Sequence, residues 1–200
     1  MDLVEPPNRK EADNLLPELI REYSDPSRHY HNLDQLRDCF TMLDEVMAKL
    51  PGTGSVELAL WYHDFFYDSK ASVPFNEETS ADLAYLKLTR ALGFTVEYGL
   101  QVANLILATD HRRAPATREA KVLLDLDLSI LSADDRRYDQ YELAIRREYG
   151  WASDDKYKAG RTKFLRAMLD RQWVYSTPEL RGGPWEGRAR RNLERALAAL

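Results

Sequence analysis

The sequence predicts a single all-α domain of about eight or nine helices, which spans residues 1–200. Apolar residues recur at three- and four-residue steps along most of the chain, and this is the period of an amphipathic helix. No segment of four to eight residues shows the two-residue alternation that is typical of a half-buried strand. The length of 200 residues, with 44% hydrophobic and 30% charged residues, is that of one globular domain with a sizeable core.

Three helices are predicted in the first third of the chain. Residues 11–22 form a short first helix, and residues 32–50 form a second, which is ended by the Pro-Gly pair after it. The third helix, 56–67, is apolar on nearly all sides, so we expect it to lie at the centre of the domain. A loop is predicted over residues 70–75.

Caps and acidic residues mark the helices that follow. Asn76, with two glutamates behind it, is expected to start a helix that ends at Gly93, because acidic residues suit the positive end of a helix. The remaining helices are predicted over 95–109, 117–131, 133–149, 154–173 and 185–200, with Thr95 as the cap of the first of them. Residues 175–184 form the least regular segment, which is a candidate loop over a site.

Charge and cysteine content narrow the class of partner and the compartment. A net charge of −5 gives no general affinity for nucleic acid, although a metal and a few arginines would suffice for a nucleotide. Cys39 is the only cysteine, which excludes an intramolecular disulfide and favours a reducing compartment. Residues 1–10 lack the regions of a secretory signal, and no apolar run reaches the roughly 18–20 residues of a membrane span. We therefore expect a cytoplasmic protein without membrane contact; whether it forms a homo-oligomer is open.

Two strings place ionisable residues among apolar ones. His63 and Asp64 lie together within the predicted third helix, and an unpaired carboxylate in such a setting is costly. In the helix predicted over 117–131, the apolar face is directed towards Asp127, whereas Asp125 points to nearly the opposite side and is expected to face outward. Two interpretations are open for these strings: their polar groups form buried contacts with carbonyls and arginines, or their carboxylates bind a cation.

Together with His31, these residues resemble the ordered H…HD…D motif of the HD superfamily of metal-dependent phosphohydrolases. Their separations are similar, and the flanking strings look like those of a bacterial branch of predicted metal-dependent phosphohydrolases. The strings are 28–32, 61–68, 76–81, 108–111, 125–131 and 186–193. The resemblance covers the chain from about residue 10 to residue 200, and it implies an HD-type helical bundle.

The resemblance also implies one divalent cation bound by His31, His63, Asp64 and Asp127, with water completing the shell. Two imidazoles and two carboxylates suit Mn²⁺, Fe²⁺, Co²⁺, Ni²⁺ or Zn²⁺, and Mg²⁺ through waters. His31 is preferred to His29 because the predicted helix begins directly after it. A second metal would need further histidines, and the chain has only four, so a single cation is favoured.

The activity implied is hydrolysis of a phosphate ester or anhydride, because a bound cation activates water and polarises a phosphoryl oxygen. Besides the ligand Asp64, two carboxylates are candidates for orienting that water or moving its proton. Asp68, one turn further on, is the first, and Glu77 is the second. The structural alternatives are a loop residue for Asp68 and a partner of the helix dipole for Glu77.

Cationic and aromatic side chains near the motif are candidates for holding the substrate. Those expected to contact phosphate are Arg28, His29, His111 and Arg190, with solvated surface charge as the alternative for each. Tyr30, Trp61 and Tyr67 lie close enough in sequence to stack on a base, although core packing is the alternative, above all for Trp61. We therefore expect a nucleotide-type small molecule as the substrate.

Two other functions stay open. A non-catalytic HD module that binds a nucleotide or a partner protein is the main alternative, although all four ligand positions are present. A metal-dependent oxygenase would need additional histidine ligands, which this chain lacks. The sequence does not distinguish a monophosphate, a cyclic diester and a pyrophosphate as the substrate.

Overall fold

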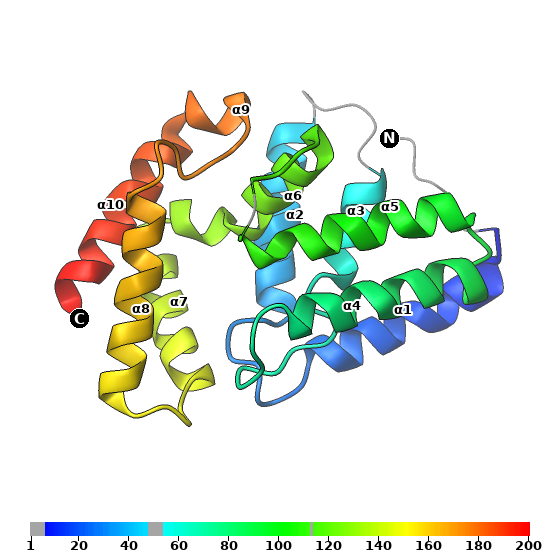
Figure 1. Cartoon of the computed structure of the whole chain (residues 1–200), viewed down its shortest axis with the longest axis horizontal. Coiled ribbons are helices and arrows are strands. Elements are labelled where there is room, and N and C mark those ends of the chain that lie inside the picture. Colours follow the sequence, from blue (N-terminus) through cyan, green and yellow to red (C-terminus); the bar gives the residue numbers. More distant parts are fainter. Residues whose placement is uncertain (1–6, 48–53, 113) are drawn as a thin grey trace.

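The computed structural model describes residues 7–47, 54–112 and 114–200, and the regular elements in these ranges are helices (Figure 1). The α-helices there are α1 (Arg9–Tyr23), α2 (Leu33–Met47), α3 (Gly54–Tyr62), α4 (Phe75–Leu86), α5 (Val96–Leu107), α6 (Arg118–Asp127), α7 (Asp135–Glu148), α8 (Asp154–Leu169), α9 (Pro178–Arg181) and α10 (Pro184–Ala199). A π-helical turn, Lys87–Ala91, extends α4, and 3₁₀ turns follow at Ala108–Asp110 and Ser129–Ser132. The predicted all-α fold is confirmed. The described ranges contain ten α-helices, slightly more than the eight or nine predicted.

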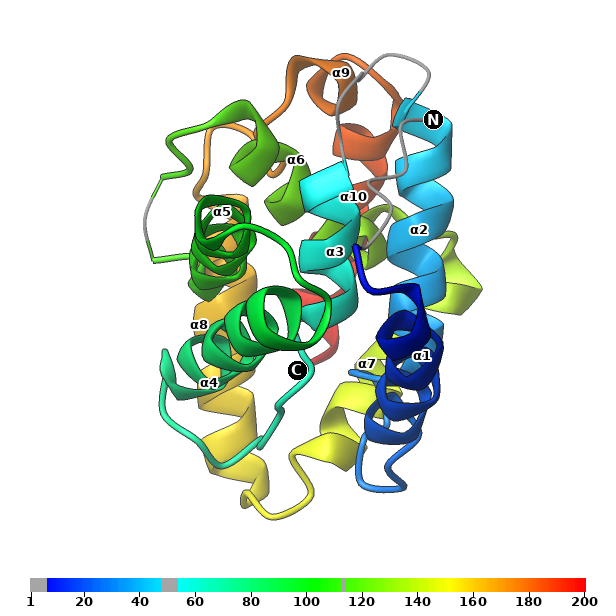
Figure 2. The ribbon, with the colours of Figure 1, turned by 90° about the vertical axis from the view of Figure 1, so that its right-hand side faces the viewer.

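The helices are arranged in groups along the long axis of the molecule (Figure 1 and Figure 2). α1, α4 and α5 lie at one end, α7, α8 and α10 lie at the other, and α2, α3 and α6 lie between them. α3 contacts α2, α4, α5 and α6, and its Val56, Ala59 and Leu60 side chains are fully buried. The central position predicted for the third helix is therefore confirmed. One apolar core joins the groups, from Leu15 of α1 to Leu193 of α10.

Side-chain caps define where two of the helices begin. The hydroxyl oxygen of Thr95 accepts the N–H of Tyr98 at 3.2 Å, which confirms the predicted cap of α5. The hydroxyl of Thr117 accepts the N–H of Ala120 at 3.1 Å at the start of α6. These bonds satisfy N–H groups that have no partner within their own helix. Gly93 ends the preceding helix as predicted, with a φ of +77° that disfavours any Cβ.

The third helix is shorter than predicted, because distant side chains replace its last hydrogen bonds. α3 ends at Tyr62 and not at residue 67. The N–H of Asp64 donates to the hydroxyl oxygen of Tyr23 at 3.2 Å. The Arg28 guanidinium donates to the carbonyl oxygens of Asp64 and Phe65 at 2.6 and 2.8 Å. Asp64 and the histidine before it thus lie in a turn after the helix, not inside it.

Other predicted boundaries differ mainly at the C-terminal ends of helices. The helix predicted over 117–131 stops at Asp127, and a 3₁₀ turn takes its place. The helix predicted over 154–173 stops at Leu169. The predicted end of the second helix near residue 50 lies outside the described residues.

Asp125 is buried, contrary to the prediction that it faces outward, because the segment predicted as a loop covers it. Its side chain is only 1% exposed. The carboxylate accepts the N–H groups of Ser176 and Thr177 at 2.6 and 2.7 Å and the Thr177 hydroxyl at 2.6 Å. Tyr175, next to these residues, is also buried. The segment 175–184, which contains α9, is therefore anchored to α6.

Replacing Asp125 by alanine is expected to lower the free energy of unfolding by roughly 2–3 kcal/mol, because two buried main-chain N–H groups and a hydroxyl lose a charged acceptor. Asp82→Ala is the control, since Asp82 is an exposed carboxylate within α4, and its loss should change stability by less than about 0.5 kcal/mol. Urea unfolding followed by circular dichroism measures both. Equal midpoints for the two variants would contradict the anchoring role of Asp125.

Candidate functional site

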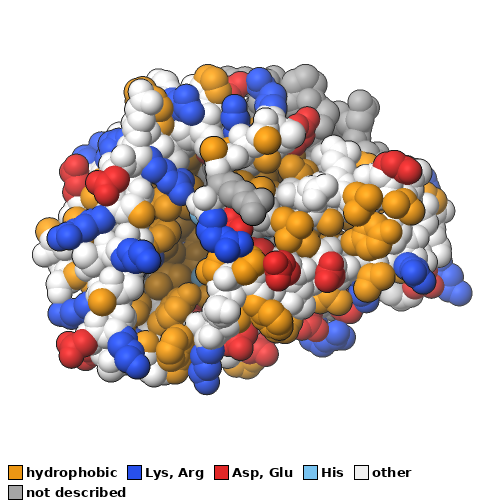
Figure 3. Space-filling model, in the orientation of Figure 1, with side chains coloured by type: hydrophobic (Ala, Val, Ile, Leu, Met, Phe, Trp, Pro, Cys, Tyr) orange, Lys and Arg blue, Asp and Glu red, His pale blue; other side chains and the backbone are white. Residues whose placement is uncertain are grey.

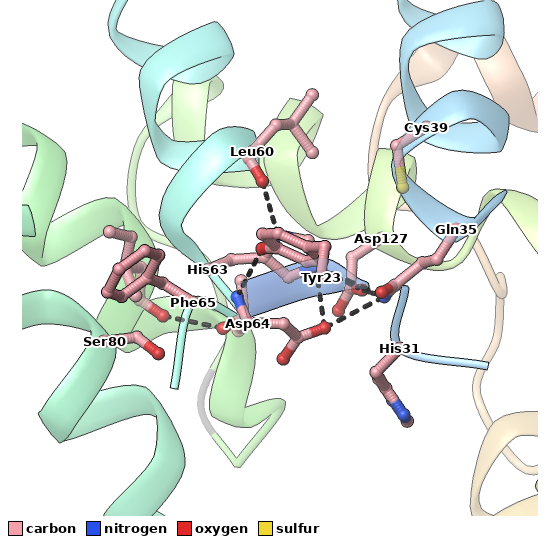
Figure 4. A network of polar contacts seen from close by, with 12 residues as sticks. Tyr23, His31, Gln35, Cys39, Leu60, His63, Asp64, Phe65, Ser80 and Asp127 are labelled. Atoms are coloured by element: carbon pink, nitrogen blue, oxygen red, sulfur yellow. Dashed lines mark hydrogen bonds and ion pairs between the residues drawn. The ribbon is translucent and has the colours of Figure 1, made fainter. Parts of the chain in front are cut away.

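Three ionisable side chains meet where α3 and α6 end (Figure 4). His63 and Asp64 directly follow α3, and Asp127 is the last residue of α6. One ligand-type atom from each of the three lies within 4.8 Å of the others. The Nε2 atom of His63 lies 3.1 Å from Oδ2 of Asp64 and 3.5 Å from Oδ1 of Asp127. This group, called here the His-Asp-Asp group, is one that could hold a metal ion, since two carboxylates and an imidazole converge on one point.

The orientation of His63 is set by its other ring nitrogen. The ring is buried, and its Nδ1–H donates to the carbonyl oxygen of Leu60 at 2.7 Å. Nε2 is therefore the nitrogen that faces the two carboxylates, as in metal sites where a backbone carbonyl selects the tautomer of the ligand. Burial by itself lowers the pKa of His63, but Asp64 and Asp127 raise it well above the ordinary value. A positive charge is thus favoured at this point between the carboxylates.

Both aspartates of the group stay ionised although they are partly buried. Burial raises the pKa of Asp64, but the neighbouring His63 lowers it below the ordinary value. Burial likewise raises the pKa of Asp127, and hydrogen bonds from His111 and His63 hold it well below that value. The Nε2 atom of His111 lies 3.0 Å from Oδ2 of Asp127. His111 was predicted to contact phosphate, and the structure places it next to Asp127, one of the candidate metal ligands.

Gln35 completes the surroundings of the group and was missed by the sequence analysis. Its Nε2 donates to Oδ2 of Asp64 at 3.0 Å and to Oδ1 of Asp127 at 3.4 Å. Its Oε1 is buried and has no hydrogen-bond partner among the described residues. A turn of the amide would direct this oxygen at the carboxylates, which is favourable only with a cation between them. The available signal was its spacing from Cys39 and Met42, which share the buried side of α2.

His31 lies outside the His-Asp-Asp group. Its ring is directed away from Asp127 (Figure 4), stacks on Tyr67 with centroids 4.1 Å apart, and forms an ion pair through Nδ1 with Glu148. Glu148 also accepts the N–H groups of Tyr30 and His31 at 2.7 and 3.1 Å. The sequence analysis did not single out Glu148, although it follows Ile145 by three residues on the buried side of α7. The structure thus assembles three of the four predicted ligands and pairs the fourth with an acid.

The predicted ligands line one cleft with a volume of about 340 Å³, and both predicted proton carriers line it too. Asp68 accepts the N–H of Lys70 at 2.9 Å through Oδ1. Glu77 is half-buried, and its Oε2 has no hydrogen-bond partner among the described residues. Burial raises the pKa of Glu77, and the negative charge of Asp64 adds to this effect. Glu77 is therefore better suited than Asp68 to carry a proton in the cleft.

Three residues predicted to contact phosphate do not line this cleft. Arg28 is buried, and besides holding the turn after α3 it lies 3.4 Å from the carbonyl oxygen of His31. His29 is exposed. Arg190 pairs with Glu186 at 2.8 Å and donates to main-chain carbonyl oxygens after α8. Arg28 and Arg190 thus support the main chain, and the expectation that they bind phosphate gains no support from their contacts.

No family model matches the chain, and neither the curated proteins nor the solved structures include a match. The resemblance to the HD superfamily therefore stays a prediction from the motif. Within the described ranges, each helix is too short or too polar to cross a membrane.

Replacing Glu148 by glutamine is expected to lower the pKa of His31. Burial opposes the charge on this ring, and the Glu148 carboxylate is what raises its pKa above the ordinary 6.5. NMR titration of the imidazole in EDTA-treated protein measures the change. Glu194→Gln, at an exposed position of α10, is the control and should leave the titration as it is. An unchanged His31 titration in Glu148→Gln would show that the ion pair does not form in solution.

The same ion pair predicts a pH window for stability. The raised pKa of His31 stabilises the fold fully below pH 6.5, and this contribution is lost as the pH rises through the raised value. The pKa of Glu148, which burial raises and His31 lowers to about 2, stabilises above pH 4.5 and is lost as the pH falls through about 2. The difference in the free energy of unfolding between wild type and Glu148→Gln should therefore be largest between pH 4.5 and pH 6.5, where both contributions are fully present. A gap that does not vary with pH would contradict the pairing.

Proposed function

We propose that this protein is a metal-dependent phosphohydrolase of the HD type, in which His63, Asp64 and Asp127 hold one divalent cation. The observation that supports this proposal most directly is the His-Asp-Asp group itself, which lies in a cleft lined by further polar side chains. Its mixed nitrogen and oxygen donors suit Mn²⁺, Fe²⁺, Co²⁺, Ni²⁺ or Zn²⁺, with Mg²⁺ held through waters. A cation bound there would supply a water of lowered pKa and a positive charge for the phosphoryl oxygens.

The surroundings of the group support a cation. Two ionised carboxylates lie together in a partly buried place, and a protonated His63 balances their charge when no cation is bound. After a turn of its amide, the unpartnered Oε1 of Gln35 would offer a further oxygen at this point. His31 lines the same cleft and stays a candidate fourth ligand, through the ring nitrogen that does not contact Glu148. Since the cation would replace the proton of His63, its binding should tighten as the pH rises.

The chain's own residues account for the proton movements of hydrolysis. The oxygen of water forms a bond to phosphorus, the bond to the leaving oxygen breaks, and a proton must pass from the water to that oxygen. Glu77 fits this task because its raised pKa lets it hold a proton, its Oε2 has no hydrogen-bond partner among the described residues, and the residue lines the cleft. His111, which contacts Asp127 through Nε2, also lines the cleft and stays a candidate contact for the phosphate.

Replacing His63 by alanine is expected to remove bound metal and to lower kcat/KM by more than about 100-fold, because a direct ligand is lost. The assay follows phosphate released from nucleotides and generic phosphoesters with Mn²⁺, Mg²⁺, Co²⁺ and Ni²⁺, and metal content is measured by mass spectrometry. His29→Ala is the matched control, since this exposed histidine does not line the cleft, and it should keep metal and activity.

Asp127→Asn should lose metal as well, because an amide lacks the charge that holds a cation. Full hydrolysis by wild-type protein shown to be metal-free would refute the proposed function. A protein that binds metal but hydrolyses no member of the panel would favour the non-catalytic alternative.

Replacing Glu77 by glutamine should lower kcat by about 10²–10⁴-fold, the range of general acid–base catalysis. Metal content should not change, since Glu77 lies outside the His-Asp-Asp group. Asp68→Asn is the comparison, and it should lower kcat less because its Oδ1 already accepts the N–H of Lys70. Full activity of Glu77→Gln beside an inactive Asp68→Asn would exchange the roles of the two residues.

A further inference from the structure

A second cavity adjoins the cleft on the side of α7 and α8. Its volume is about 460 Å³, within the roughly 300–1,000 Å³ that is usual for small-molecule sites. His31, Tyr141, Tyr149 and Phe164 line both this cavity and the cleft, so the two spaces share a wall. Figure 3 shows a hollow lined by hydrophobic side chains beside α8. We call this second space the aromatic cavity.

Aromatic rings dominate the lining of the aromatic cavity: Tyr141, Tyr149, Trp151, Tyr157 and Phe164. The rings of Tyr149 and Trp151 lie 6.0 Å apart at 37°. Trp151 is 51% exposed. Its indole N–H donates to the hydroxyl of Ser69 at 3.0 Å, beside the loop that carries Asp68. The aromatic wall is thus fixed to the rim of the cleft.

The charges of the aromatic cavity do not make it a second phosphate site. Arg161 is buried and paired with Glu142 through two bonds of 2.7 and 3.0 Å, and its guanidinium lies over the rings of Tyr141 and Phe164. Its charge is therefore already balanced. Lys156, which has no ion pair with a described residue, adds one exposed positive charge to the lining. The cavity suits a neutral, planar group with polar edges.

Gly160 keeps room in the cavity. It lies within α8, where glycine weakens a helix relative to alanine. A Cβ placed on it would meet no atom within 4 Å, so the space beside this position is open. Gly160 lines the aromatic cavity. This position therefore leaves room at the cavity for a further group.

We propose that the aromatic cavity binds the base of a nucleotide substrate while the phosphate of that substrate lies at the His-Asp-Asp group. This inference rests on the proposed function and adds the part of the molecule that selects the substrate. A base stacks on aromatic rings through its face, whichever base it is. The two spaces share lining residues and so lie side by side, which suits a nucleotide, because its base and its phosphate are joined by one sugar.

Binding of adenosine, which carries no phosphate, tests the aromatic cavity without relying on turnover. Isothermal titration calorimetry is carried out with Mn²⁺-loaded wild type and with Gly160→Trp, whose indole should fill the cavity. We expect adenosine to bind the wild type and to bind Gly160→Trp at least about 10-fold more weakly, the loss of one stacked base. Circular dichroism checks that the variant is folded, and Gly160→Leu, which fills less space, should give a smaller loss.

Two glycine variants serve as controls. Gly160→Ala adds one methyl group to open space and should keep adenosine binding. Gly187→Trp places the same indole on α10, at an exposed glycine outside the cavity lining, and should also keep it. Equal adenosine affinity in Gly160→Trp and in the wild type, or no binding to the wild type, would overturn the inference.

Failure of the two proposals can be told apart. A wild type that hydrolyses phosphoesters but does not bind adenosine keeps the proposed function and overturns the base site. A wild type that binds adenosine through the Gly160 face but hydrolyses nothing overturns the proposed function and supports the base site. Where AMP and ribose 5-phosphate are both hydrolysed, the ratio of their kcat/KM values should exceed about 10 in the wild type and fall towards one in Gly160→Trp.

Discussion

Two carboxylates, those of Asp64 and Asp127, lie together in a partly buried place, and the rest of the site follows from the need to balance their charge. Burial alone would raise both pKa values, yet the imidazoles of His63 and His111 keep the acids ionised. The Gln35 amide donates to both carboxylates. Each surrounding side chain thus offers a positive or polar group to this pair of acids. A divalent cation would neutralise both negative charges.

The position of Asp64 depends on Arg28, which binds the main chain of the turn after α3. Arg28 donates to the carbonyl oxygens of Asp64 and Phe65, and it therefore joins the segment after α1 to the turn after α3. A guanidinium has several donors in a fixed plane, so one side chain can serve several carbonyls at once. Its place next to His31 in the sequence suggested contact with phosphate. Its burial gives it a different task, which is to hold the main chain of the site.

The two spaces of the site are built from different parts of the fold. The ends of α3 and α6 supply the ionic group, because they meet where polar side chains can face one another, and α2 adds the amide of Gln35. The pair α7 and α8 supplies rings and an arginine that is already neutralised by Glu142. Glu148 at the end of α7 links the parts through its contacts with His31. If both proposals hold, the ionic group releases the phosphate and the aromatic cavity selects the substrate, so the two tasks fall to different parts of the fold.

The sequence by itself determined the all-α fold, the cap at Thr95 and the burial of the third helix, because these depend on local periodicity and capping. It also singled out His63, Asp64 and Asp127 as candidates, since ionisable residues among apolar ones need partners. Only the tertiary structure decided where α3 ends, which acid His31 meets, and that Gln35 joins the group. The buried Asp125 likewise depends on a segment about fifty residues away in the chain. These features arise from contacts between distant parts of the chain, which helical periodicity does not encode.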